Sequence, residues 1–173
     1  VGAGTILPVK SSLVSEHTMH REPFVITLDF LEKLRSRSGK LVAVGTTSVR
    51  TLESLYYIGV RCIESGVPGD VDQWDPYCRK YEYSLDESLG ALIDYLKDNS
   101  LNELQLGTRI IIVPGYEFKV VDVLVTNFHQ PQSTLLLLIS AFVKGDWHKI
   151  YDFALANDFR FLSYGDSSLL FKE

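Results

Sequence analysis

The chain has 173 residues, of which 46% are apolar, with a mean hydropathy of +0.06 and a formal net charge of −5. These values predict one globular domain over residues 1–173 and, because no apolar run reaches about 18 residues, exclude a transmembrane helix and a membrane partner. The two cysteines, Cys62 and Cys78, lack C-x-x-C spacing, so we expect reduced thiols in a cytoplasmic protein and no disulfide or zinc framework. A pI of about 5.4 does not favour phosphate contacts, so a nucleic-acid surface would have to be local or lie outside this sequence.

The amino end carries two short polar motifs. Gly2 and Gly4 allow a backbone to approach a ligand closely, although GAGT lacks the third glycine of a dinucleotide fingerprint and its composition alone predicts a turn. His17 and His20 have no third ligand in a recognisable spacing, so we predict no metal site. If this segment is extended, His20 and Glu22 lie on one side, where they would suit acid–base work or form only a surface contact.

A helix is predicted over 27–37, ended by Gly39, and a short buried strand over 41–44. The turn Gly45–Ser48 then opens a second helix. Its three hydroxyl residues and Arg50, one turn inside, predict a carboxylate or phosphate site at the helix amino terminus. Ordinary N-capping is the alternative.

The remaining elements have local sequence signals. Residues 59–83 are the least readable, and Ser84–Glu87 is a capping box that starts a helix. A β-branched strand is predicted over 107–113, a helix capped by Asp146, and a last strand over 168–171. Because strands and helices alternate, we predict an α/β fold with a layered, mixed or largely parallel sheet and helices on both faces.

The stretch 114–142 has the strongest pattern. A strand over Val120–Val125 leads into a polar group at Thr126–His129, and Pro131 prevents the strand from continuing. Ser133 or Thr134 then caps an interior helix. A polar loop between a strand and a helix is a typical place for a catalytic group, although a plain connection would have the same pattern.

This stretch, GYEFKVVDVLVTNFHQPQSTLLLLISAF, resembles the signature of the S-adenosylmethionine:tRNA ribosyltransferase-isomerase family of queuosine biosynthesis. Other blocks of the family occur in the expected order. Only 56–106, which is longer than the family pattern leads us to expect, shows little likeness. Those blocks are Val1–Thr5, His17–Glu22, Ala43–Ser54 and Phe159–Asp166.

The resemblance implies that the chain is the carboxyl-terminal part of a longer protein and lacks the family's amino-terminal portion with its β-barrel domain. It implies transfer and isomerisation of the ribosyl unit of S-adenosylmethionine onto 7-aminomethyl-7-deazaguanine at the tRNA wobble position. The products would be epoxyqueuosine, adenine and methionine. S-adenosylmethionine would be a substrate, no cofactor or metal would be bound permanently, and we expect a monomer.

The resemblance also supplies site residues. The acid–base candidates are His129 first, then His20, Glu22 and Asp122, without an assignment of acid and base. The substrate-binding candidates are polar, glycine and aromatic residues of the same blocks: Gly2, Gly4, Thr5, Thr46, Thr47, Ser48, Arg50, Tyr116, Phe118, Asn127, Phe128, Ser133, Thr134, Tyr164 and Asp166.

Gln130 and Gln132 depart from the family pattern, which has an apolar and a basic residue there, so a phosphate contact at this point is not expected. Two other functions stay open. One is a different S-adenosylmethionine-dependent RNA-modifying enzyme, such as a methyltransferase, although the full Gly-rich fingerprint is missing. The other is a non-catalytic RNA-binding module, which the low basicity does not favour.

Overall fold

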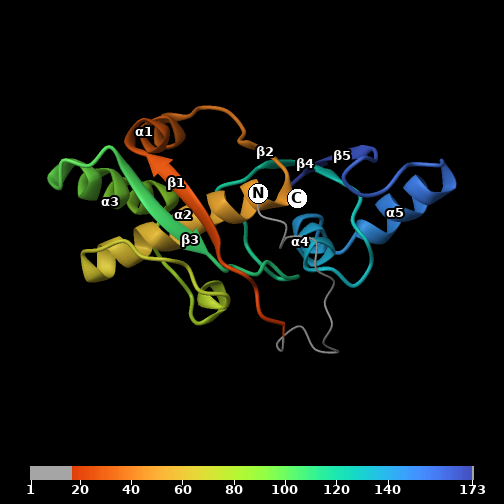
Figure 1. Cartoon of the computed structure of the whole chain (residues 1–173), viewed down its shortest axis with the longest axis horizontal. Coiled ribbons are helices and arrows are strands. Elements are labelled where there is room, and N and C mark those ends of the chain that lie inside the picture. Colours follow the sequence, from red (N-terminus) through yellow and green to blue (C-terminus); the bar gives the residue numbers. More distant parts are fainter. Residues whose placement is uncertain (1–16, 173) are drawn as a thin grey trace. The chain divides into compact units, whose positions relative to one another are not determined.

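The structure, a computed structural model, describes residues 17–172 (Figure 1). Its contacts divide the chain into two compact units. Among the described residues, unit 1 comprises 17–18, 40–49 and 111–172, and unit 2 comprises 19–39 and 50–110. The prediction of one domain stays a prediction, and each unit is described by itself.

Unit 2 is built on an antiparallel pair of strands, β1 (Glu22–Thr27) and β3 (Glu103–Thr108), which lie side by side in Figure 1. Helix α1 (Leu28–Ser36) follows β1 directly, with the hydroxyl of Thr27 as its cap. A short 3-10 helix, η3, covers Asp75–Tyr77. The predicted capping box starts α3 (Leu85–Asp98), in which Ser84 and Glu87 exchange hydrogen bonds as expected.

Helix α2 (Thr46–Ser65) has its first turn in unit 1 and the rest in unit 2. In unit 2 it packs closely on α3, because a Cβ built on Gly59 would lie 2.2 Å from the carbonyl oxygen of Ser88. The Ser88 hydroxyl donates to the carbonyl of Tyr56 at 2.7 Å. The side chains of Ser88 and Tyr56 are fully buried, so this helix crossing is a closely packed part of the core of unit 2.

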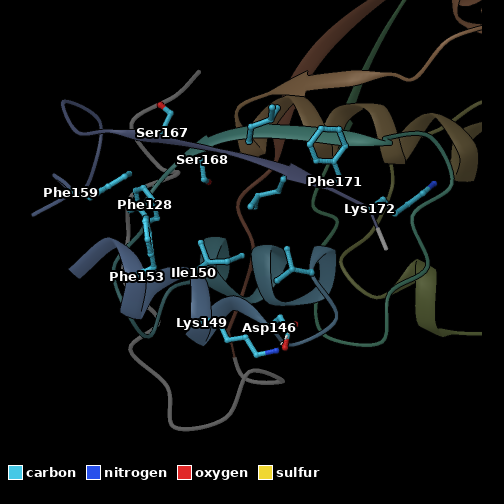
Figure 2. A pocket seen from close by; sticks show the side chains of 13 residues that line it. Phe128, Asp146, Lys149, Ile150, Phe153, Phe159, Ser167, Ser168, Phe171 and Lys172 are labelled. Atoms are coloured by element: carbon cyan, nitrogen blue, oxygen red, sulfur yellow. Dashed lines mark hydrogen bonds and ion pairs between the residues drawn. The ribbon is translucent and has the colours of Figure 1, made fainter. Parts of the chain in front are cut away.

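Unit 1 contains a mixed three-stranded sheet in the order β2 (Val42–Val44), β4 (Val123–Asn127) and β5 (Ser167–Phe171). β4 pairs parallel with β2 and antiparallel with β5. Its helices are α4 (Thr134–Phe142) and α5 (Trp147–Ala156), and α5 runs beside β5 in Figure 2. Ser133 caps α4 through its hydroxyl, which accepts from the N–H of Leu136.

The α/β class and the mixed pairing are confirmed, although the described strands form two small sheets rather than one layer. The predicted strand over 107–113 is wrong in its bounds. β3 ends at Thr108, because its antiparallel partner β1 begins at Glu22, opposite Thr108. Ile110–Ile112 continue as buried, irregular backbone. The side chain of Asp146 does not cap α5 but pairs with Lys149 at 3.0 Å.

Candidate active site

The parallel pairing of β2 and β4 brings two polar loops to one edge of the sheet. The carboxyl end of β2 leads into Gly45–Ser48, and the carboxyl end of β4 leads into Thr126–His129. Gly45 has φ of +87°, which a side chain would disfavour, and its N–H donates to the carbonyl of Val125 at 2.8 Å. The edge formed by the ends of parallel strands is where α/β proteins place ligands.

A pocket of about 510 Å³ opens at this edge, within the size range of small-molecule sites. We call it the His129 pocket. Most of its lining side chains are uncharged and polar. It is lined by Val44, Gly45, Thr46, Thr47, Ser48, Thr126, Asn127, His129, Gln130, Pro131, Ser133, Thr134, Leu135, Leu162, Ser163 and Tyr164.

The first turn of α2 forms one wall of the His129 pocket. Gly45 accepts the first helical hydrogen bond, from the N–H of Val49 at 3.3 Å, and has no side chain with which to cap the helix. The hydroxyl of Ser48 donates backwards to the carbonyl of Val44 at 2.8 Å. The wall therefore offers the positive end of the helix dipole, with no acidic residue in the first turn to oppose it.

His129 lies on the other wall and is held from two sides. Its Nε2 shares a hydrogen bond of 2.9 Å with the hydroxyl of Thr126, and the ring tautomer decides which group donates. Its backbone N–H donates to the hydroxyl of Tyr151 at 2.9 Å. Tyr151, on α5, was not predicted to take part, and nothing in its helical spacing distinguishes it from a core residue.

The imidazole of His129 is neutral at physiological pH. Burial lowers its pKa from the ordinary value of 6.5 to about 4, because the charged form loses its hydration. A neutral ring can accept a proton or share one N–H as a hydrogen bond. It does not carry the proton that a general acid must deliver, so the lowered pKa favours the role of base or hydrogen-bonding group over that of acid.

A tight turn over residues 160–166 closes a third side. Asn127 donates through Nδ2 to the carbonyls of Gly165 and Asp166, at 3.3 and 3.2 Å. Leu162 has φ of +68° and donates its N–H to the carbonyl of Phe128 at 2.8 Å. A non-glycine residue held in this region is strained, and such strain is often found at binding sites. Sequence reasoning missed Leu162, because a left-handed conformation leaves no signal in a leucine.

The two residues of this turn that were predicted to bind substrate, Tyr164 and Asp166, have different positions relative to the pocket. Tyr164 lines the pocket and is 97% exposed, so its ring is free to meet a ligand. Asp166 instead closes the turn, since its carboxylate accepts from the N–H of Arg160 at 2.7 Å. That bond, followed by the contact with the Arg160 side chain, lowers the pKa of Asp166.

The aromatic candidates lie in packed clusters. Phe128 is 3% exposed and meets the rings of Tyr151 and Phe159 edge to face, which anchors the loop that carries His129. Tyr116 meets Phe118 at a centroid distance of 5.0 Å, and Phe118 meets Phe142 at 4.8 Å. These contacts are ordinary aromatic packing, and a substrate role for them stays a prediction.

Two further acid–base candidates form a cluster with Arg50 in unit 2, which we call the Glu22–Arg50 cluster. Nη1 of Arg50 lies 2.5 Å from Oε1 of Glu22, and Nε2 of His20 lies 3.1 Å from the same oxygen. Nε of Arg50 donates to the carbonyl of Ile110 at 2.9 Å. The expected common side of His20 and Glu22 is therefore observed. Burial lowers the pKa of Arg50, and the charge of Glu22 opposes that shift.

Asp122, the remaining acid–base candidate, makes contacts that stabilise the fold. Its Oδ2 accepts from the backbone N–H of Leu41 at 2.9 Å, and Oδ1 lies 3.3 Å from Nζ of Lys172. It does not line the His129 pocket. Gly2, Gly4 and Thr5 lie outside the described residues, so their predicted contact with substrate stays a prediction.

A second hollow in unit 1, about 640 Å³, lies between α5 and β5 (Figure 2). Its lining includes phenylalanines from four places in the chain. Of its charged residues, Asp146 and Lys149 pair with each other and Lys172 pairs with Asp122. It contains no histidine. The His129 pocket, with its titratable group and helix terminus, is therefore the better candidate for chemistry.

Within residues 17–172, no group of three or more His, Cys, Asp or Glu side chains converges as metal ligands would. None of the helices in this part of the chain has the length and apolar run needed to cross a bilayer.

Comparison with known proteins identifies the family. The profile of the family described as "Queuosine biosynthesis protein" matches residues 1–170. The chain belongs to the queuosine biosynthesis protein family. This match includes 56–106, where the motifs alone showed little likeness.

Curated relatives of this queuosine biosynthesis family match the whole chain. The S-adenosylmethionine:tRNA ribosyltransferase-isomerases of Caulobacter vibrioides (strain NA1000 / CB15N) and Rickettsia bellii (strain OSU 85-389) are 42% and 36% identical to it. The chain spans only 38% and 39% of their respective lengths. The crystal structure of S-adenosylmethionine tRNA ribosyltransferase from Thermotoga maritima superposes with a TM-score of 0.55 at 32% identity. That match covers 85% of this chain and 39% of the other.

Proposed function

We propose that this protein acts as an S-adenosylmethionine:tRNA ribosyltransferase-isomerase, with the His129 pocket as the site for S-adenosylmethionine. The observation that carries the proposal is a single pocket that combines a neutral imidazole with the amino terminus of a long helix. Relatives that are 36% and 42% identical over the whole chain are S-adenosylmethionine:tRNA ribosyltransferase-isomerases, which supports this reaction. In the reaction that we propose, the ribosyl unit is transferred to 7-aminomethyl-7-deazaguanine at the tRNA wobble position.

In this proposal His129 removes a proton from the carbon beside the sulfonium. That step needs an imidazole that is neutral before it reacts, and burial favours the neutral form. The hydroxyl of Thr126, 2.9 Å from Nε2, orients the ring. The bond from the His129 N–H to Tyr151 fixes the backbone, so the ring approaches substrate from a rigid loop.

The opposite wall suits the amino-acid end of S-adenosylmethionine. The backbone N–H groups of Thr46–Ser48 and the hydroxyls of Thr46 and Thr47 offer hydrogen bonds to a carboxylate, and the helix dipole adds a favourable field. Arg50, predicted for the same role, is already paired with Glu22, so the helix terminus itself is the better carboxylate site. The exposed ring of Tyr164 offers a face to the sulfonium or the adenine.

Product analysis of the natural full-length protein tests the function. It is incubated with S-adenosylmethionine and a tRNA that carries 7-aminomethyl-7-deazaguanine, and the products are followed by mass spectrometry. We expect adenine, methionine and an epoxyqueuosine-containing tRNA. S-adenosylhomocysteine in place of adenine would mark a methyltransferase and overturn the proposal, as would binding of tRNA without any product.

A further inference from the structure

The Glu22–Arg50 cluster in unit 2 has hydrogen-bonding capacity that no described residue uses. Arg50 is 2% exposed and Glu22 is 6% exposed, yet Nη2 of Arg50 and Oε2 of Glu22 have no hydrogen-bond partner within residues 17–172. Nε2 of His20 likewise makes no hydrogen bond there, although it lies close to Oε1 of Glu22. An unpaired buried polar atom is costly, and three in one cluster mark a place that a further group completes.

The network around the cluster holds these atoms in place. Glu22 begins β1 opposite Thr108 at the end of β3. The hydroxyl of Thr108 accepts from the N–H of Ile110 at 2.9 Å and from the hydroxyl of Ser54 at 2.7 Å. Since Ile110 in turn accepts from Nε of Arg50, the guanidinium is held by a backbone contact as well as by Glu22. The free donor and the free acceptor are thus built into the fold.

Charge limits what completes the cluster. The guanidinium and the carboxylate neutralise each other, so a phosphate or a lone carboxylate would meet the repulsion of Glu22 without a spare positive charge. A neutral or zwitterionic group that presents an acceptor to Arg50 and a donor to Glu22 fits. The side chain of His20 is 38% exposed and contacts Glu22, so the cluster lies next to solvent on that side.

We propose that the Glu22–Arg50 cluster binds the hydrogen-bonding edge of a nucleobase, with Nη2 of Arg50 donating to a ring acceptor and Oε2 of Glu22 accepting from the adjacent N–H. A base edge carries these two groups side by side and is uncharged. An α-amino acid fits less well, because its ammonium carries three N–H donors and the cluster has one free carboxylate oxygen. The choice of a nucleobase as the ligand rests on the proposed tRNA substrate. The pattern of one free donor and one free acceptor does not rest on that proposal, because it comes from the unpaired atoms of the cluster.

Nucleoside binding to the natural full-length protein tests this inference. Guanosine, adenosine, cytidine and uridine, with methionine as the amino-acid probe, are titrated separately while backbone amide resonances are followed by NMR. We expect saturable binding of at least one nucleoside, with shifts at Glu22 and Arg50, and no such shifts with methionine. This measurement needs no substitution and so does not depend on the folding of a variant.

A paired substitution sharpens the test. Glu22→Leu together with Arg50→Met removes both charges at once, and exchange of a whole buried ion pair for apolar residues is often tolerated. We expect at least tenfold weaker nucleoside binding. The matched control is Arg35→Met with Asp86→Leu, which removes an exposed pair of the same kind in unit 2 and should leave binding within twofold of wild type.

Three outcomes would overturn the inference: no nucleoside bound by the wild type, equal binding by the Glu22/Arg50 variant, or shifts at the cluster with methionine. The first of these is also the result expected if ordered water alone completes the cluster. Adenine release by the wild type is measured on the same preparation. Release without nucleoside binding would leave the proposed function standing and reject this inference alone.

Discussion

At the scale of single residues, His129 is defined by its environment more than by its identity. The family motif predicts that His129 is catalytic. The protonation state of His129, however, depends on its burial, and its orientation depends on partners from β4 and α5. The same holds for Arg50. The sequence suggested a free cation for an anionic group, whereas Glu22, which is 28 positions away, already neutralises it. Partners at such separations are set by strand pairing and helix packing, which no local pattern encodes.

The low pKa of His129 predicts a pH dependence of stability. Between its native value of about 4 and the ordinary 6.5, the unfolded chain binds more protons than the folded one. The stability gained by keeping the ring neutral is therefore complete above about pH 6.5 and is lost as the pH falls towards 4. The free energy of unfolding in urea is measured at pH 7 and at pH 4.5. Between these two values, His129→Gln should lose less stability than wild type does, and the difference should be on the order of 1–3 kcal/mol. An unchanged pH dependence would contradict the buried neutral ring.

Pocket shape gives a second prediction at this scale. Thr47 lines the His129 pocket on the first turn of α2, so Thr47→Phe should fill part of it. Because a ligand that binds only the folded state raises its melting temperature, S-adenosylmethionine should stabilise the wild type in a thermal shift assay. We expect Thr47→Phe to lose most of this shift. Ser38→Phe, in an exposed loop, is the control and should retain it, and loss in both variants would argue against the pocket.

At the scale of elements, local rules predicted most helices and fewer strands. The caps at Thr27, Ser84 and Ser133 fixed the starts of α1, α3 and α4, because N-capping is a local interaction. β1 was missed and β3 was placed too late. Their bounds come from pairing with each other across most of unit 2, and the buried run Ile110–Ile112 resembles a strand in composition without being paired as one.

The crossing of α2 and α3 yields a prediction about the core of unit 2. In Gly59→Ala, the new Cβ would lie 2.2 Å from the carbonyl of Ser88, so the helices must separate or shift. We expect a loss of about 1–3 kcal/mol in chemical denaturation. Gly39→Ala is the matched control, since a Cβ there meets nothing within 4 Å, and its stability should stay within about 0.5 kcal/mol of wild type. Equal effects would contradict the close crossing.

At the scale of the whole molecule, the family and the fold class were predictable because separated sequence blocks occur in a fixed order. The division into two compact units was not, since each unit is assembled from discontinuous stretches of the chain. The chain spans about two fifths of the length of its curated relatives. The His129 pocket, in contrast, is lined wholly by residues of unit 1 of this chain.

The rate of adenine release from S-adenosylmethionine in the presence of tRNA tests the central proposal most directly. His129→Ala in the full-length protein should lower this rate by about 10²–10⁴-fold, the usual contribution of a general base, with an unchanged fold by circular dichroism. His148→Ala removes an exposed histidine of α5 and should stay within twofold of wild type. Release by His129→Ala at the wild-type rate would contradict the assignment of His129 as the base.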